Sequence, residues 1–261
     1  MKEKLYNFPQ YYDVAFSWDI SREIKFFQEL FTKYVPFEEK NILEPACGTG
    51  RFLVKLPEYG YHITGYDNNP KMLIFAKKRI IDAGLQNIVT VEKKNMKSAK
   101  FKIKFDAAIN SINSIGYLLS DEDILSHFKN TGESLKSKGI YIVHLACACD
   151  HPEFQEKPDD SWILEKEGIK IKTTWLIDKY DIEKKISYQT CKMEIDDHGK
   201  QTTLEDHHIL RLWFFEDIKS LIRKSEKFKL EAIYDEKHKQ ISLDTHISGE
   251  LGNLYYIFKA L

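Results

Sequence analysis

The amino-acid sequence predicts an α/β protein whose central sheet is mostly parallel and carries helices on both faces. Two observations lead to this class. In the first half of the 261 residues, apolar runs of strand length alternate with amphipathic helical stretches, and such alternation implies parallel strands joined by right-handed crossovers. From Trp162 to Trp213 the pattern changes to long runs of alternating or β-branched residues, which predict antiparallel hairpins. The chain is therefore expected to be one α/β domain with an embedded antiparallel sheet.

The individual elements follow from the spacing of apolar residues. Helices are expected where apolar side chains recur every three or four residues, and strands where short apolar or β-branched runs end at turn residues. The predicted helices cover residues 21–35, 70–83, 121–136 and 215–225. The predicted strands lie around Ile42 and over residues 61–67, 87–92, 105–110, 140–146, 229–236 and 253–261.

The stretch from Asn41 to Leu56 reads as a buried strand, a glycine turn and a helix start in immediate succession. Gly48 and Gly50 permit a sharp turn that lets backbone approach a nucleotide-like ligand. The next strand ends in Asp67, about 20 residues further on, where a carboxylate can accept both hydroxyls of a ribose. This pair of signals predicts a cofactor that contains adenosine.

The same turn narrows the choice of cofactor. A dinucleotide fingerprint needs a third glycine three residues after the second, and bulky Leu53 stands there. A phosphate loop needs Lys followed by Ser or Thr at the helix start, and the chain has Arg51 and Phe52 instead. Pyrophosphate and triphosphate ligands are therefore disfavoured.

Five segments in order resemble the motifs of class I S-adenosylmethionine-dependent methyltransferases of the small-molecule type. They are "EPACGTG" (44–50), "GYDNNPKMLIFAKKR" (65–79), "VEKKNM" (91–96), "KFDAAINSINSIGYL" (104–118) and "SLKSKGIYIVHL" (134–145). The resemblance extends over about residues 8 to 146 and only in outline over the last third. It implies a Rossmann-like, doubly wound sheet of seven strands with one antiparallel strand, and an inserted antiparallel β cap.

The resemblance also implies a division of the chain. We expect an N-terminal lid and helix over residues 1–40 and a cofactor-binding core over 41–150. An antiparallel cap over 151–214 would cover the substrate site, and residues 215–261 would complete the core sheet.

S-adenosylmethionine is the cofactor that the resemblance implies, with S-adenosylhomocysteine as the product. Glu44 would place the methionine ammonium, the two glycines would pass beside the adenosine and methionine portions, and Asp67 would bind the ribose. The expected cofactor contacts are Tyr11, Glu44, Ala46, Gly48, Gly50, Asp67, Asn68, Met72, Asn95, Met96 and Asn110. The alternatives are an ordinary strand-to-helix turn, helix capping by Asp67, Asn68 or Asn69, and a loop at Asn95 that meets no ligand.

The exit of the fourth strand is where the transferred methyl group should point. The Asn-Pro-Pro-Tyr box of DNA and protein-glutamine methyltransferases is absent there, which disfavours planar amide or exocyclic base nitrogens as acceptors. Tyr117 and His208 are the candidate catalytic residues, with packing and a structural histidine as the alternatives. His208 is chosen over His207 because it shares strand parity with Leu210 and Leu212. The candidate substrate contacts are Tyr12, Trp18, Arg22, Asn113, Trp175, Arg211 and Trp213.

Composition bounds the remaining possibilities. A net charge of −1 offers no global field for nucleic acid, so a small-molecule acceptor is expected and nucleic acid is not. The four cysteines lack zinc-site spacing, which predicts no metal. No apolar run is long enough to span a membrane and the first residues lack a signal-peptide core, so we expect a cytoplasmic monomer or homodimer.

The expected reaction is in-line transfer of a methyl group to a nitrogen or oxygen atom of a small metabolite. Two other functions stay open: methylation of RNA or protein, and binding of S-adenosylmethionine without catalysis.

Overall fold

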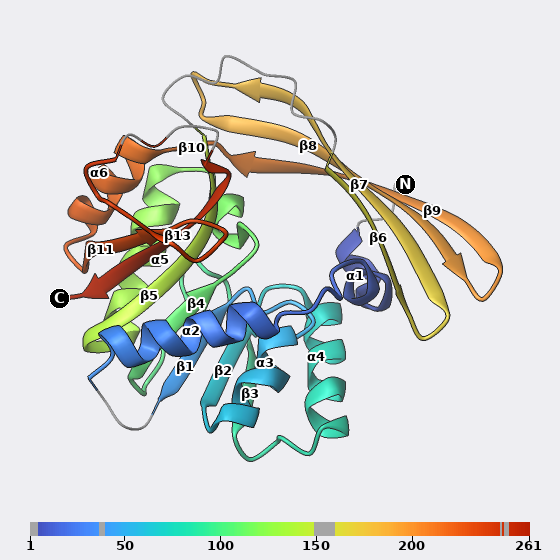
Figure 1. Cartoon of the computed structure of the whole chain (residues 1–261), viewed down its shortest axis with the longest axis horizontal. Coiled ribbons are helices and arrows are strands. Elements are labelled where there is room, and N and C mark those ends of the chain that lie inside the picture. The colour runs from blue at the N-terminus through green and yellow to red at the C-terminus, as the bar shows by residue number, and fades with distance from the viewer. Residues whose placement is uncertain (1–4, 37–39, 149–159, 246, 248–250) are drawn as a thin grey trace.

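The structure is a computed structural model that describes residues 5–36, 40–148, 160–245, 247 and 251–261. Its main sheet begins with five strands that all pair in parallel (Figure 1). In sequence they are β1 (Asn41–Pro45), β2 (His62–Asp67), β3 (Val89–Lys93), β4 (Phe105–Asn110) and β5 (Leu135–Ala148). In space their order is β3-β2-β1-β4-β5, so the chain reverses its direction of travel across the sheet after β3.

The last part of the chain completes this sheet. Strand β13 (Asn253–Ala260) pairs antiparallel with β5 and also with β11 (Phe228–Tyr234). The seven long strands therefore contain one reversed strand, as the sequence predicted. Two short strands, β10 (Trp213–Phe214) beside β5 and β12 (Gln240–Ile241) beside β11, extend the sheet to nine strands and were not predicted.

Helices cover both faces of the main sheet because alternate strand residues point to opposite sides. On one face, α2 (Ser21–Tyr34), α3 (Arg51–Lys55) and α4 (Pro70–Asp82) pack over Ile42, Ile109 and Ile142. On the other, α5 (Asp121–Ser134) and α6 (Phe215–Ser225) pack over Leu43, Ala108 and Val143. These two cores confirm the doubly wound α/β class.

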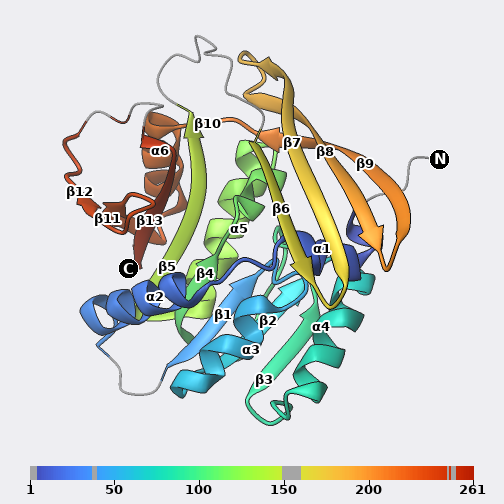
Figure 2. The same cartoon turned by 45° about the vertical axis from the view of Figure 1, so that its right-hand side comes forward.

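A second sheet stands apart from the first and is wholly antiparallel (Figure 2). It consists of β6 (Asp160–Lys166), β7 (Ile169–Asp181), β8 (Ile186–Asp197) and β9 (Lys200–Arg211), paired in sequence order. Glu167 and Gly168, and likewise His198 and Gly199, have positive φ angles, the conformation that two-residue hairpin turns require. Local turn chemistry thus sets the register of this sheet.

The N-terminal segment joins the two sheets. It comprises the short 3₁₀ turn η1 (Leu5–Asn7) and helix α1 (Pro9–Ala15), which lie between the second sheet and α4 (Figure 2). Val14 and Phe16 form a third core with Ile171, Met193 and Ile195 of the second sheet. No helix in the described part of the chain is long and apolar enough to cross a membrane.

Candidate active site

The glycine turn follows β1 and is held by the strand beside it. Ala46, Gly48 and Gly50 all have positive φ, and the backbone N–H of Gly48 donates to Asp67 Oδ2 over 3.0 Å. The backbone N–H of Asn69 donates to the other oxygen, Asp67 Oδ1, over 2.8 Å. The carboxylate at the end of β2 therefore fixes the shape of the turn at the end of β1.

Close packing of α3 on the sheet is achieved without a third glycine. A Cβ on Gly65 of β2 would stand 2.8 Å from Leu53 and 2.9 Å from Cys47, closer than real Cβ atoms come. Dinucleotide-binding folds have a glycine on the helix at this contact. In this chain the glycine is Gly65 on β2, and the side chain of Leu53 on α3 packs against it. This arrangement explains why a bulky residue is tolerated at Leu53.

The structure shows which of Asp67, Asn68 and Asn69 caps α4. Asn69 caps α4, because its side-chain oxygen accepts from the backbone N–H groups of Lys71 and Met72. Asn68 is exposed, and Asp67 is largely enclosed. Burial raises the pKa of Asp67, while the N–H groups of Asn69 and Gly48 oppose that shift. Asp67 is thus free of the capping role.

Glu44 lies under the turn and is 4% exposed. Its Oε2 atom has no hydrogen-bond partner among the described residues. Burial raises the pKa of Glu44 to about 8, with Arg51 lowering it and Asp67 raising it further. A buried carboxyl group with an unused oxygen is costly unless a donor or cation is supplied to it.

Arg51, which the sequence did not single out as a ligand contact, organises the same region. Its Nη1 donates to the carbonyl oxygen of Phe16 over 2.6 Å, and its guanidinium lies 4.7 Å from the ring of Trp18. Arg51 therefore ties the start of α3 to the segment after α1.

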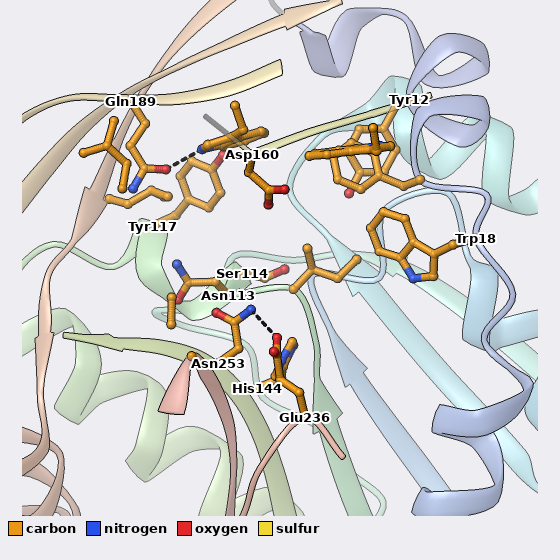
Figure 3. A pocket seen from close by; sticks show the side chains of 18 of the residues that line it. Tyr12, Trp18, Asn113, Ser114, Tyr117, His144, Asp160, Gln189, Glu236 and Asn253 are labelled. Atoms are coloured by element: carbon orange, nitrogen blue, oxygen red, sulfur yellow. Dashed lines mark hydrogen bonds between the residues drawn. The ribbon is translucent and has the colours of Figure 1, made fainter. Parts of the chain in front are cut away.

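A cavity of about 1720 Å³ opens beside this region, at the carboxyl ends of β4 and β5 and beneath the second sheet (Figure 3). Ligands bind at this edge of open α/β sheets as a rule. Its walls are rich in aromatic side chains, namely Tyr6, Tyr12, Phe16, Trp18, Tyr117, Trp162, Trp175 and Tyr180. A cavity of this size can hold a small metabolite next to the turn.

The floor of the cavity carries polar atoms without partners. The backbone N–H of Asn113 donates to the carbonyl oxygen of His144, so the exits of β4 and β5 lie together. Asn113 Oδ1 and both ring nitrogens of His144 have no hydrogen-bond partner among the described residues. The His144 ring stacks on Tyr255 at 4.3 Å, and burial lowers the pKa of His144 to about 4, so the ring is neutral at pH 7.

The charged groups of the cavity are mostly acidic. Among its described lining residues, Glu23, Asp160, Asp178 and Glu236 are matched by Lys179 alone. Asp160 and Glu236 are seen in Figure 3 on opposite sides of the cavity, and Glu236 accepts from Asn253 Nδ2 over 2.8 Å. Burial raises the pKa of Glu23, to which Tyr255 and Trp18 donate. This lining favours a cationic ligand over an anionic one.

The two residues predicted to be catalytic are in contact. Tyr117 lines the cavity, and its hydroxyl lies 2.9 Å from His208 Nδ1 and 2.6 Å from the hydroxyl of Tyr6. The His208 ring stacks on Trp175 at 4.9 Å, and Trp175 Nε1 donates to Gln189 Oε1. His207 is exposed and His208 is buried, so strand parity selected the inward histidine.

Among the predicted substrate contacts, Tyr12, Trp18, Asn113 and Trp175 line the cavity. Tyr12 also borders the glycine turn, because its ring lies 3.9 Å from where a Cβ on Gly48 would stand. Tyr11, expected at the cofactor, instead donates its hydroxyl proton to Asp197 of β8. Tyr12 thus lies at both the cavity and the glycine turn, whereas Tyr11, one residue before it on α1, faces the second sheet.

Three predicted substrate contacts lie elsewhere. Arg22 is exposed and donates to the carbonyl oxygen of Lys237. Arg211 donates to the carbonyl oxygen of Leu119 and pairs with Asp121, and Trp213 is 1% exposed in the core under α6. None of the three lines the cavity, which speaks against direct substrate contact. Arg22 lies on α2, Arg211 has the strand parity opposite to that of cavity-lining Leu210, and Trp213 pairs with β5 in the main sheet.

Several predicted cofactor contacts serve the protein itself. Asn110 donates to the carbonyl oxygen of Pro45 and accepts from the N–H of Ile115, so its side chain braces the ends of β1 and β4. Exposed Asn95 accepts from the N–H of Lys97, and Met96 packs against the core. Met72 is 2% exposed. These positions speak against side-chain contact by Asn110 and Asn95.

Most of the described lining residues escaped the sequence reasoning, among them Tyr6, Glu23, His144, Asp160 and Glu236. For His144 a signal existed, because it is the polar residue near the carboxyl end of an otherwise apolar strand. For Asp160 and Glu236 there was none, since they lie far apart in sequence and only the fold brings them to one cavity.

Comparison with known proteins agrees with this geometry. Residues 42–139 match the family model described as a methyltransferase domain. YqeM of Bacillus subtilis, provisionally named a methyltransferase, is 32% identical over 105 residues, which are 40% of this chain and 42% of YqeM. The dTDP-3-amino-3,4,6-trideoxy-alpha-D-glucopyranose N,N-dimethyltransferase of Streptomyces venezuelae is 28% identical over 106 residues, 41% of this chain and 42% of its own length. The chain thus spans well under two thirds of these curated relatives.

Solved structures match over nearly the whole chain. The structure of DesVI from Streptomyces venezuelae superposes with a TM-score of 0.75 at 18% identity, covering 96% of this chain and 95% of its own. An S-adenosylmethionine-dependent methyltransferase from Clostridium acetobutylicum gives a TM-score of 0.76 at 18% identity, with 97% of both chains covered. The aligned region covers at least 96% of this chain, so it includes the second sheet as well as the main sheet.

The chain has the fold of solved S-adenosylmethionine-dependent methyltransferases over nearly its whole length. Its residues 42–139 are similar in sequence to the methyltransferase-domain family.

Proposed function

We propose that the chain is an S-adenosylmethionine-dependent methyltransferase that acts on a nitrogen or oxygen atom of a small metabolite. The observation that carries this proposal is the bond from Gly48 N–H to Asp67 Oδ2, which fixes an adenosine-type turn directly beside a large, partly enclosed cavity. The methyltransferase relatives and the N-methyltransferases among the structural neighbours support it.

The residues at the turn fit the proposed cofactor. Each carboxylate oxygen of Asp67 accepts one backbone N–H and has a second lone pair left for a ribose hydroxyl. The unused Oε2 of Glu44 is a partner for the ammonium of the methionine portion. The rings of Tyr12 and Trp18 supply faces that attract a positively charged sulfur.

S-adenosylmethionine supplies a methyl group already activated by its positive sulfur. The chain's own residues then have to hold an acceptor in line, exclude water and receive a proton. The aromatic walls and the second sheet enclose the acceptor, while Asn113 and His144 offer hydrogen-bonding atoms at the floor. Because His144 is neutral at pH 7, it can accept a hydrogen bond from an amine or hydroxyl.

The acidic lining extends the proposal to the kind of acceptor. Four carboxylates against one lysine favour an amine over a phosphate-bearing compound, although one curated relative is named for a nucleotide-linked amino sugar. A labelled-methyl screen tests this with aminohexoses, polyamines and amino alcohols, each paired with its phosphate ester. We expect the free amines to be methylated faster. Faster methylation of the esters would contradict the amine preference.

Calorimetry tests the cofactor site directly. Replacing Asp67 by Ala removes a charged acceptor from the turn, and such hydrogen bonds contribute about 1.5–3 kcal/mol, so affinity for S-adenosylmethionine and S-adenosylhomocysteine should fall about 10–100-fold. The matched control is Asp82→Ala, which alters an exposed carboxylate on α4 that pairs with Lys78. Absence of binding to the wild-type chain, or unchanged affinity in Asp67→Ala, would contradict the proposed function.

A further inference from the structure

We propose that Tyr6, Tyr117 and His208, with Asp206 behind them, form a relay that carries a proton out of the acceptor cavity. We further propose that docking of the segment Leu5–Asn7 completes this relay. The inference rests on the proposed function, because methylation of a neutral amine leaves a positively charged nitrogen whose proton the relay would take up.

The relay is a continuous chain of contacts from three separate parts of the molecule. Tyr6 and Tyr117 both line the cavity, and their hydroxyl oxygens are 2.6 Å apart. The Tyr117 hydroxyl lies 2.9 Å from His208 Nδ1. On the far side of the ring, His208 Nε2 lies 3.9 Å from Asp206 Oδ2, within the range of an ion pair once the ring is protonated.

The surroundings of His208 set the direction of proton transfer. Among the described residues, Asp206 is a charged group that faces the ring, and Tyr6, Tyr117 and the indole of Trp175 pack on it. A carboxylate on the Nε2 side favours the tautomer with hydrogen on Nε2, which leaves Nδ1 as acceptor. Tyr117 then donates to Nδ1, and Tyr6 donates to Tyr117.

Both tyrosines keep their protons in the resting site. Burial raises the pKa of Tyr117 and raises the pKa of Tyr6 well above its ordinary value. Neither serves as a tyrosinate base, so each can only pass a proton onward. The Tyr6 oxygen, whose own hydrogen points to Tyr117, presents its lone pairs toward the cavity.

The transfer balances in protons and charge. The neutral acceptor nitrogen bonds the methyl carbon while the carbon–sulfur bond breaks and its electron pair stays on sulfur. The nitrogen, now positive, gives its proton to the Tyr6 oxygen, Tyr6 gives its hydroxyl proton to Tyr117, and Tyr117 gives its own to His208 Nδ1. Each tyrosine ends neutral, and the positive charge rests on His208 opposite Asp206.

The N-terminal segment is part of this device. The backbone N–H of Leu5 donates to Asp206 Oδ2 over 2.9 Å, and the carbonyl oxygen of Tyr6 accepts from Asn69 Nδ2 over 3.1 Å. The Tyr6 ring also contacts that of Tyr12 beside the glycine turn. The docked segment therefore connects Asn69, which caps α4 beside the glycine turn, with Asp206, the carboxylate next to His208.

The first arm of the test is structural and needs no acceptor. In the full chain with ¹⁵N-labelled histidine, His208 should show the Nε2–H tautomer with a hydrogen-bonded Nδ1, identified by loss of its signals in His208→Gln. Tyr117→Phe should shift the Nδ1 signal. Tyr34→Phe is the control, since it removes a tyrosine hydroxyl from the pair with Tyr234, and neither residue lines the cavity. An Nδ1–H tautomer in the wild type, or no shift in Tyr117→Phe, would overturn the relay.

The second arm is kinetic and uses the amine with the highest turnover in the screen above. Tyr6→Phe, Tyr117→Phe and His208→Gln should each lower kcat about 100-fold, the low end of the range for loss of a proton-transfer group, while calorimetric affinity for S-adenosylmethionine stays within about twofold. The fall in kcat at low pH should disappear in His208→Gln. The control is His207→Gln, because His207 lies on the opposite face of β9 and contacts Thr190.

The outcomes separate the two proposals. Unchanged kcat and pH profile in Tyr117→Phe and His208→Gln, in an active wild-type enzyme, would overturn the relay and leave the proposed function standing. A wild-type chain that binds the cofactor and methylates no amine or hydroxyl compound would overturn the function and the relay's proton-carrying role together, even if the tautomer pattern is as expected.

Discussion

At the site, the protonation and hydrogen bonding of a single side chain depend on how deeply that side chain is buried. Glu44 is the clearest case, because its carboxyl group is enclosed, has an unused oxygen, and has a pKa raised to about 8 from an ordinary 4.5. A positive charge placed beside it would reverse that shift. Glu44 should therefore report on what binds.

The first prediction concerns proton release on cofactor binding. At pH 7 Glu44 is mostly protonated in the free chain, and the methionine ammonium should lower its pKa, so binding should release up to about one proton. Calorimetry at pH 7 in phosphate and in Tris measures this, because the two buffers differ in heat of ionisation. Glu44→Gln should abolish the buffer dependence. Equal heats for the wild type in both buffers would show that Glu44 does not meet the ammonium.

The second prediction concerns stability of the free chain. The folded state holds the Glu44 proton more tightly than the unfolded state, so the unfolded state binds fewer protons between pH 4.5 and about 8, and the free energy of unfolding should fall across that window. Glu44→Gln should remove this contribution. Urea unfolding at pH 5 and pH 8.5 should show that the variant gains stability relative to wild type only at the higher pH. A gain that is equal at both pH values would contradict the assignment.

At the scale of elements, α1 is fixed by a buried carboxylate. Asp13 is 3% exposed and pairs with Arg79 of α4 at 2.7 Å and with Lys166 of β6 at 2.9 Å. One side chain thus joins the N-terminal helix to α4, which covers the main sheet, and to the second sheet. The position of Tyr12 beside the glycine turn depends on this anchor.

The third prediction follows from that anchor. Asp13→Asn leaves two cations near an uncharged, buried side chain and should lower the free energy of unfolding by about 2 kcal/mol, less than for a fully buried pair because both cations are partly exposed. The control is Asp82→Asn in the exposed pair with Lys78, with an expected change below about 0.5 kcal/mol. Denaturant unfolding measures both. If both variants lower the free energy of unfolding by the same small amount, the ion pairs of Asp13 do not stabilise the position of α1.

Elements were predicted well where local patterns decide them. The strands of the main sheet, α2, α4 and the turn between β8 and β9 follow directly from apolar spacing and turn residues. The strands β10 and β12 have only two residues each, and no periodicity can be read from so short a run. They exist because neighbouring strand edges were available for pairing.

At the scale of the whole molecule, the cavity is bounded by both sheets and the N-terminal segment, while net charge is near zero. An enclosed, acidic cavity does not attract a polyanion. The cavity therefore favours a small methyl acceptor over a nucleic acid.

The fourth prediction tests that choice. When the chain is given labelled S-adenosylmethionine and a cell extract, the label should appear in compounds that pass a small-pore filter. RNA and protein retained on the filter should stay unlabelled, and added salt should have little effect on the rate, since no phosphate contacts are displaced. Label retained on the filter and removed by ribonuclease or protease would favour a macromolecular acceptor.

The reversed strand of the main sheet followed from the family resemblance. The patterns of the sequence itself determined the α/β class, the glycine turn with Asp67, and the inward parity of His208. These depend on residues close together in the chain or on periodic patterns. Only the tertiary structure decided that Tyr12 rather than Tyr11 meets the turn, that Arg211 and Trp213 face away from the cavity, and that Tyr6, Tyr117 and His208 touch. The physical reason is that such contacts join η1, η3 (Ser114–Tyr117) and β9, whose relative placement is set by packing over long sequence distances, which local spacing does not encode.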